Sequence, residues 1–309
     1  MITILNNGTV GLATQTEPTS GCWLNVIDPT PEEIARLQEL GIPQDFITYP
    51  LDMDERARME RENGEILILL RVPVFQGDNA DIPYFTIPLG IILTNRLIVT
   101  VCKKDNDILQ GFVSGRVRDV STYKRNRFVL RLLLGTANKY LTYLREINKS
   151  VDALEDQLQL STRNKEVLEL LKYQKSLTFF TTALKSNELM MERLQRSQLF
   201  KTYADDEDLL EDVLTENQQA IEMTNIASNI LSSMMDAFAS IISNNLNAIM
   251  KFLASVTIVL SLPTIIASLF GMNVNLPFET HPLAFLLVLG ISFLISGSVV
   301  FIFWKRDWF

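Results

Sequence analysis

Small residues and hydroxyl or amide side chains, with one methionine among them, recur at helical spacing in an otherwise apolar segment near the C-terminal end of the chain. The positions follow one another in steps of three or four residues, so on an α-helix they share one face. They are Asn247, Met250, Ala254, Thr257, Ser261, Thr264, Ser268 and Gly271. Neutral oxygens of this kind accept hydrogen bonds from the water shell of a cation without holding the ion as strongly as a ring of carboxylates does. The row therefore predicts a path for hydrated cations along one helix face.

A packing seam is the alternative interpretation of the same row, because membrane helices also approach one another through small residues and bond through Ser and Thr. Asn247 at one end and Asn273 beyond the other favour a path, since a seam needs no amide at both mouths. Met250 and Leu253 are candidates for a dewetting constriction near the Asn247 end; for Leu253, ordinary helix packing is the alternative.

Two uncharged apolar segments, Phe252–Phe270 and Pro282–Trp304, carry or follow this row. Each is about twenty residues long, the length that an α-helix needs to cross a hydrocarbon core of about 30 Å. They predict a membrane hairpin. Two helices cannot enclose a channel, so a pore requires oligomerisation around the first span. Pro263 removes one backbone hydrogen bond there and is expected to bend or loosen the helix.

The flanking charges predict the orientation of the hairpin. Lys251 precedes the first span, Lys305 and Arg306 follow the second, and the loop between the spans has no Lys or Arg. By the positive-inside rule both termini are cytoplasmic and the loop is external. Met1–Val10 lacks the features of a secretory signal, so we expect a multi-pass protein of the plasma (inner) membrane.

Composition excludes several functions. The net charge of −8 argues against nucleic acid as a partner. The only cysteines, Cys22 and Cys102, suit a reducing cytosol, and His281 is the only histidine, which leaves almost no basis for a His/Cys zinc site. There is no nucleotide-binding glycine loop and no metal-ligand spacing, so we expect neither an enzyme nor a small organic substrate.

The first third of the chain predicts a compact α/β domain with a mixed sheet. A helix over Glu32–Leu40 follows two prolines and is stopped by Gly41, and Thr94-Asn95 reads as a two-residue turn. The expected strands are Cys22–Ile27, Ile66–Val74, Phe85–Leu93 and Arg96–Val101.

Beyond Asp119 the chain reads as long helices, because proline is absent between Pro88 and Pro263. We expect helices over Val120–Thr162 and Lys165–Leu199, a break at Tyr203–Asp206, and a third helix from there to Phe270. At 1.5 Å per residue the third is on the order of 100 Å long.

Six positions in the middle of the third helix, five apolar and one an asparagine, recur at coiled-coil spacing: Ile226, Ile230, Met234, Ala237, Ile241 and Asn244. They indicate packing on the two preceding helices, a bundle of identical helices around an axis, or both on opposite faces. The expected organisation is an α/β cytosolic domain (1–119), a helical region (120–204), a stalk and pore helix (205–270, with the span at about 250–270), an external loop (271–281), a second span (282–304) and a basic tail (305–309).

Gly271-Met272-Asn273 lies at the outer end of the first of two C-terminal spans, a placement that resembles the CorA family of magnesium channels and transporters. Pro263–Ala267 and the basic, aromatic Trp304–Trp308 are similar to that family as well, and Trp23–Val26 and Leu51–Arg58 are weaker landmarks. The resemblance implies a funnel-shaped homopentamer with one pore helix per subunit. It implies uptake of Mg²⁺, with Co²⁺ and Ni²⁺ as secondary ions.

The resemblance also assigns site residues. Gly271, Met272 and Asn273 fall on the selectivity filter, and the pore-lining positions are Asn247, Met250, Leu253, Thr257, Ser261 and Thr264. Small, reluctantly dehydrated Mg²⁺ suits a ring of amides that bind its waters.

Members of this family close when cytosolic Mg²⁺ bridges acids of neighbouring subunits. Asp212 aligns with the sensor aspartate, and Asp208 is a weaker candidate in the same acidic cluster at the base of the long helix. Helix capping is the plain explanation of that cluster. On the partner side this chain departs from its best-known relatives, with Thr48 and Tyr49 where they have paired acids, and Asp52 and Asp54 are the nearby candidates.

Two rival functions remain open at this point. A zinc or general divalent-cation transporter of the ZntB type shares the topology, although the methionine of Gly-Met-Asn favours CorA proper. A membrane-tethered cation sensor would oligomerise without conducting ions.

Overall fold

The computed structural model describes residues 1–8, 11–117, 120–160, 164–197, 204–272, 283–306 and 308. Their internal contacts divide the chain into two units, Met1–Met235 and Asp236–Phe309. The division falls within the longest helix.

A seven-stranded sheet forms the centre of the first unit, in the order β2-β1-β3-β7-β6-β5-β4. The pair β3–β7 is parallel and the other pairs are antiparallel, which confirms the predicted mixed sheet. The strands are β1 Ile2–Asn7, β2 Leu12–Gln15, β3 Trp23–Ile27, β4 Arg58–Glu62, β5 Glu65–Phe75, β6 Tyr84–Leu93 and β7 Ile98–Cys102.

The predicted two-residue turn between β6 and β7 is wrong. Leu93 pairs with Ile98, so β7 does not begin at Arg96 and four residues make the connection. The Thr94 hydroxyl accepts hydrogen bonds from the backbone N–H groups of Arg96 and Leu97 and so closes the longer loop, which alternation of apolar residues could not reveal.

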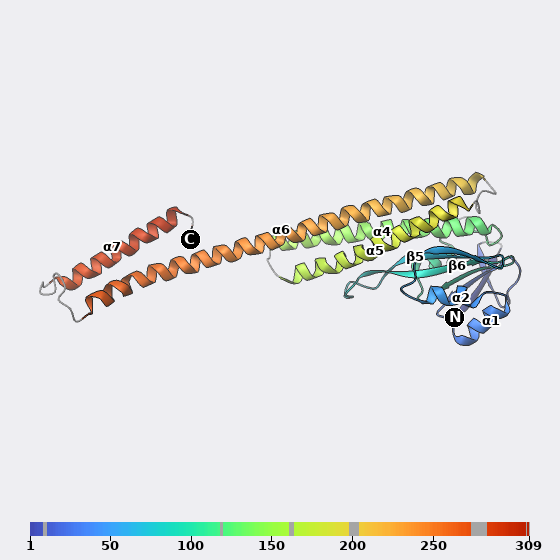
Figure 1. Ribbon diagram of the computed structural model, residues 1–309, viewed down its shortest axis with the longest axis horizontal. Coiled ribbons are helices and arrows are strands. Elements are labelled where there is room, and N and C mark those ends of the chain that lie inside the picture. Colours follow the sequence, from blue (N-terminus) through green and yellow to red (C-terminus); the bar gives the residue numbers. More distant parts are fainter. Residues whose placement is uncertain are drawn as a thin grey trace. The chain divides into compact units, whose positions relative to one another are not determined.

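Short helices cover one face of the sheet: α1 Pro31–Glu39, α2 Gln44–Thr48 and the 3-10 turn η1 Tyr49–Leu51 (Figure 1). A reciprocal cap between Thr30 and Glu33 begins α1, close to the predicted start of this helix. Alternate residues of β5, Leu67 and Leu69, point to this side and join its core.

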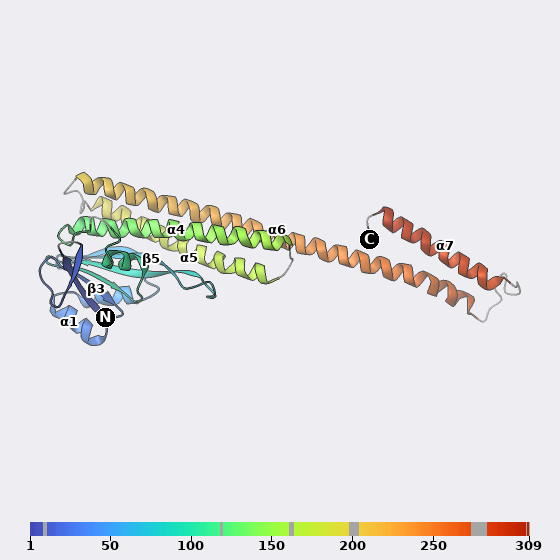
Figure 2. The same ribbon diagram turned by 180° about the vertical axis from the view of Figure 1, so that it is seen from behind.

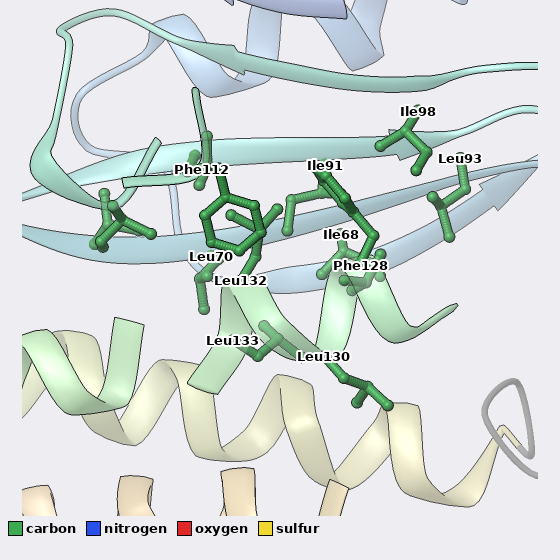
Figure 3. Close-up of a cluster of buried hydrophobic side chains, with 14 of the residues drawn as sticks. Ile68, Leu70, Ile91, Leu93, Ile98, Phe112, Phe128, Leu130, Leu132 and Leu133 are labelled. Atoms are coloured by element: carbon green, nitrogen blue, oxygen red, sulfur yellow. The ribbon is translucent and has the colours of Figure 1, made fainter. Parts of the chain in front are cut away.

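Long helices cover the opposite face, together with the short α3 Asp107–Val113 (Figure 2). Their side chains meet those of the sheet in one core, and Figure 3 shows Phe112 and Phe128 beside Ile91 and Ile68. The segments expected as 1–119 and 120–204 therefore share a core, in which Leu210 and Val213 of the longest helix also take part.

The long helices lie close to their predicted bounds. They are α4 Arg125–Leu160, α5 Asn164–Arg196, α6 Ala204–Phe270 and α7 Ala284–Lys305. The helix α6 has 67 residues and continues through Pro263. It is therefore on the order of 100 Å long, as expected.

Within the first unit α6 has two apolar faces, as the sequence allowed. One is buried at Leu210, Val213, Ile221, Ala227 and Leu231. The other carries Ile226 and Ile230 of the predicted seam, whose side chains are 58% and 53% exposed. The chain itself therefore leaves this second apolar face uncovered at Ile226 and Ile230.

Candidate functional site

The C-terminal part of α6 and the whole of α7 are long and apolar enough to cross a membrane. Only 6% of the most apolar window of each helix is buried within the chain, so these are not core helices of a water-soluble domain. Large side chains such as Phe285, Phe293 and Leu294 stay more than two-thirds exposed, as lipid-facing residues would be.

The row of small and polar residues on α6 is not covered by α7. Buried and half-buried residues recur at helical spacing on one face of each helix. On α6, Ser255 is buried and Val259, Leu262 and Ile266 are half-buried; on α7, Ser292 and Ser296 are buried and Val288 and Val299 are half-buried. These are the faces that the two helices bury. Thr257 and Thr264 are exposed and Ser261 is half-buried. A seam with α7 of the same chain therefore does not account for the row.

Three hydroxyls of the row, those of Thr257, Ser261 and Thr264, donate their protons to their own helix. Thr257 Oγ1 lies 2.8 Å from the carbonyl oxygen of Leu253, and Ser261 Oγ lies 2.9 Å from that of Ile258. Thr264 makes the same kind of bond, at 3.3 Å from its acceptor. With the proton so engaged, each oxygen keeps lone pairs for an outside donor. The row is thus a line of acceptors, which suits the water shell of a cation.

The predicted mouth is described only in part. The helix α6 ends with the N–H of Gly271 donating to Ala267 at 3.0 Å, and Met272 is exposed. Asn273, the predicted centre of the filter, lies outside the described residues. At the other end of the row Asn247 is exposed, and Met250 and Leu253 are 65% and 54% exposed, so this chain alone does not bury the predicted constriction.

The acidic cluster at the start of α6 divides into two parts. Asp205 and Asp206 form ion pairs with Arg127 of α4, at 3.2 and 2.9 Å, and the hydrogen bond that Arg127 donates to Asp206 raises the pKa of Arg127. Asp208 and Asp212, the predicted sensor residues, are exposed on the same helix. Attachment of α6 to α4 thus explains Asp205 and Asp206, but it does not explain Asp208 and Asp212.

The loop with Asp52 and Asp54 follows Pro50, whose ring packs closely on the backbone of the sheet. η1 rests on β6 at Gly90, where a Cβ atom would lie 2.2 Å from Pro50 Cγ, so no other residue fits without a shift. The backbone N–H of Asp54 donates to Asp52 Oδ1 at 3.0 Å, and both side chains are exposed.

Arg71 of β5, which the sequence did not lead us to predict, holds this loop by hydrogen bonds to its backbone. Its guanidinium donates to the carbonyl oxygens of Met53 and Glu55 at 2.7 and 2.9 Å, and to Thr86. Burial lowers the pKa of Arg71. A lone arginine within the apolar run Ile66–Val74 was the signal available in the sequence.

The sequence-predicted acids do not converge within one chain. Among the described residues no group of three or more His, Cys, Asp and Glu side chains could hold a metal ion. The departing positions have local roles: Thr48 Oγ1 donates to the Asp45 carbonyl at 3.4 Å, and the Arg58 guanidinium lies 4.6 Å from the centre of the Tyr49 ring. The described acids of one chain therefore form no metal site around Asp212.

An α/β domain joined through one very long helix to a two-helix apolar hairpin defines a membrane protein with a large domain outside the bilayer. The chain belongs to the CorA-like Mg²⁺ transporter protein family, whose pattern matches residues 19–306. The cobalt/magnesium transport protein CorA of Methanocaldococcus jannaschii is 29% identical over 298 residues, covering 93% of this chain and 90% of that protein.

Solved structures agree with this assignment. The complete structure of the CorA magnesium transporter from M. jannaschii matches with a TM-score of 0.86 and 25% identity, covering 100% of this chain and 99% of that one. The cytoplasmic domain of ZntB from Vibrio parahaemolyticus matches with a TM-score of 0.62 at 12% identity, covering 78% of this chain and 98% of that one, a likeness of fold alone.

Proposed function

We propose that this chain is one subunit of a gated channel that carries Mg²⁺ across the plasma (inner) membrane into the cytoplasm. The observation that supports this most strongly is the polar row on α6, in which Thr257 and Thr264 are exposed and Ser261 is half-buried. All three hydroxyls donate their protons to backbone carbonyls and so keep lone pairs that can accept from water. Family membership supports Mg²⁺ as the ion, and the names of two relatives add Co²⁺. The ion is the cargo, and inward movement gains about 2.3 kcal/mol per elementary charge per 100 mV.

The pore requires several copies around an axis. The exposed face of α6 with Ile226 and Ile230 supports such an assembly, and resemblance to the family supports a homopentamer. Lys251, Lys305 and Arg306 at one end of the hairpin support cytoplasmic termini. Gly271, Met272 and Asn273 would then form the outer filter.

Regulation by cytosolic Mg²⁺ is the second part of the proposal. Asp212, with Asp208 beside it, would bind Mg²⁺ together with acids of the neighbouring subunit, for which Asp52 and Asp54 are candidates. Without the ion, like charges at the subunit interfaces repel and loosen the closed state; with it, that state is held.

The test is Mg²⁺ flux into liposomes that carry the purified protein, under an applied voltage. We expect robust flux from the wild type and its loss in Asn273→Ala. Thr257→Val keeps the shape of the side chain but removes the acceptor, so flux should fall, whereas Ile258→Val on the apolar side should conduct normally. If the assembled wild type moves neither Mg²⁺ nor Zn²⁺ nor Co²⁺, the channel proposal fails and a cation sensor remains. Faster Zn²⁺ than Mg²⁺ flux would favour a ZntB-type function.

A further inference from the structure

The end of the hairpin opposite the Gly-Met-Asn loop combines cations with aromatic rings. In the segment 236–309 the only Lys and Arg residues are Lys251, Lys305 and Arg306. Since α6 runs to the loop and α7 runs back, all three belong to the same end. Their side chains are exposed, and none forms an ion pair with a carboxylate in the part of the chain that the structure describes, which does not include Asp307.

Beyond α7, Trp308 lies back against the end of the helix. The backbone N–H of Trp308 donates to the Phe303 carbonyl at 3.0 Å, and the two rings stack with centroids 5.0 Å apart and planes 12° apart. The N–H of Arg306 donates to the Ile302 carbonyl at 3.1 Å. Lys305 and Arg306, both exposed, therefore stand in the chain between Trp304 and the folded-back Trp308.

Trp304 completes the arrangement, with 69% of its side chain exposed and its ring 6.3 Å from that of Phe301. Tryptophan favours the headgroup level of a bilayer, where one part of the ring is apolar and the N–H is wet. Arginine binds phosphate oxygens through its planar fork, and lysine binds them as a point charge. Cationic side chains and indole rings at the same depth in the membrane suit a phospholipid, whose phosphodiester headgroup lies next to the start of its acyl chains.

We infer that Lys305 and Arg306, with Lys251 on the neighbouring helix, form a binding site for the headgroup of an anionic phospholipid such as phosphatidylglycerol. The inference rests on the membrane insertion in the proposed function. It has a consequence for transport: unneutralised cations at the inner end of a cation path repel Mg²⁺, and lipid phosphates would remove that repulsion. Mg²⁺ flux should therefore rise with the fraction of anionic lipid in the bilayer, and it should rise by less in the variant Lys305→Gln/Arg306→Gln.

Brominated lipids test the site without relying on flux, because bromine quenches tryptophan fluorescence only at near contact. Trp304 and Trp308 flank the site, and the third tryptophan, Trp23, is fully buried in the sheet core and serves as a constant background. The full chain is placed in phosphatidylcholine bilayers with the same small fraction of either brominated phosphatidylglycerol or brominated phosphatidylcholine.

In the wild type we expect about twofold or greater quenching by the anionic brominated lipid than by the neutral one, since polybasic segments attract anionic lipids. Lys305→Gln/Arg306→Gln should equalise the two lipids. Lys149→Gln/Lys185→Gln, which removes two exposed cations from α4 and α5, should keep the difference.

Three results would overturn the inference. Equal quenching by both lipids in the wild type would show no selectivity for anionic headgroups. Loss of the difference on addition of millimolar inorganic phosphate would show a site for free anions. No quenching by either lipid would refute membrane insertion, whereas selective quenching in a protein without flux would leave the inference standing and refute only the channel.

Discussion

The guanidinium of Arg127 on α4 donates from Nε to Oδ1 of Asp206 at 2.9 Å, and the side chain of Asp206 is only 4% exposed. Arg127 reaches Asp205 as well, but that carboxylate is 81% exposed. The buried pair ties the start of α6 to the start of α4. The rest of the acidic cluster, with Asp208 and Asp212, is left on the surface, where a cation can reach it.

Arg127→Ala should destabilise the chain by about 3 kcal/mol, because it leaves the carboxylate of Asp206 buried without its partner. Asp205→Ala is the matched control and should cost less than about 1 kcal/mol, since exposed ion pairs contribute little. Thermal unfolding of the full chain in detergent measures both. Equal losses in the two variants would contradict the difference in burial.

Substitutions at two adjacent residues of α6 should affect different properties, one the folding of the subunit and the other its assembly. Leu231 is fully buried against the chain's own helices, so Leu231→Ala should cost about 2–5 kcal/mol of unfolding free energy. Ile230 is 53% exposed, so Ile230→Ala should leave subunit folding nearly unchanged but weaken the oligomer. Unfolding curves and the oligomeric mass in detergent report the two effects. An Ile230→Ala protein that assembles as tightly as the wild type would exclude this face from the subunit interface.

Asp212→Asn tests the regulatory site. We expect the Mg²⁺ concentration that half-protects the full protein from proteolysis to rise roughly tenfold, equivalent to about 1.4 kcal/mol of binding free energy. The change keeps the shape of the side chain and removes its charge. Glu222→Gln, at another exposed acid of α6, should behave like the wild type. Unchanged protection in Asp212→Asn would remove this residue from the site.

Cys102 should be inert in the folded protein. Burial raises the pKa of its thiol to about 12, so almost no thiolate exists at pH 8. Maleimide labelling at pH 8 should therefore be slow until denaturant is added.

The sign of the linkage follows from the same shift. The pKa of the Cys102 thiol is higher in the folded than in the unfolded chain. Below the ordinary thiol value, near 9, the thiol is protonated in both states, so the stability that its burial contributes is fully present. That contribution is lost as the pH rises from about 9 to 12. Cys102→Ala should reduce the loss of stability in this range, and rapid labelling of the native wild type would contradict the prediction.

The sequence by itself determined the features that depend on local composition and spacing. The proline-free stretch marks the long helices, two uncharged apolar runs of about twenty residues mark the hairpin, and the polar row on α6 recurs every three or four residues, so all three could be predicted before any contact was known. The mixed sheet was predicted because the last two expected strands look like a hairpin while helices separate the others, and the parallel pair β3–β7 beside the antiparallel pair β6–β7 confirmed it. The turn after Leu93 was not found, because its four residues are closed by the side chain of Thr94.

Only the tertiary structure decided which faces meet. Ile230 and Leu231 are both apolar, and nothing in their spacing tells which one packs on the chain's own helices. Likewise Asp206 and Asp212 look alike in the sequence, yet one is buried against Arg127 and the other is exposed. Such choices depend on contacts between segments far apart in the chain, and a local pattern carries no information about its distant partner.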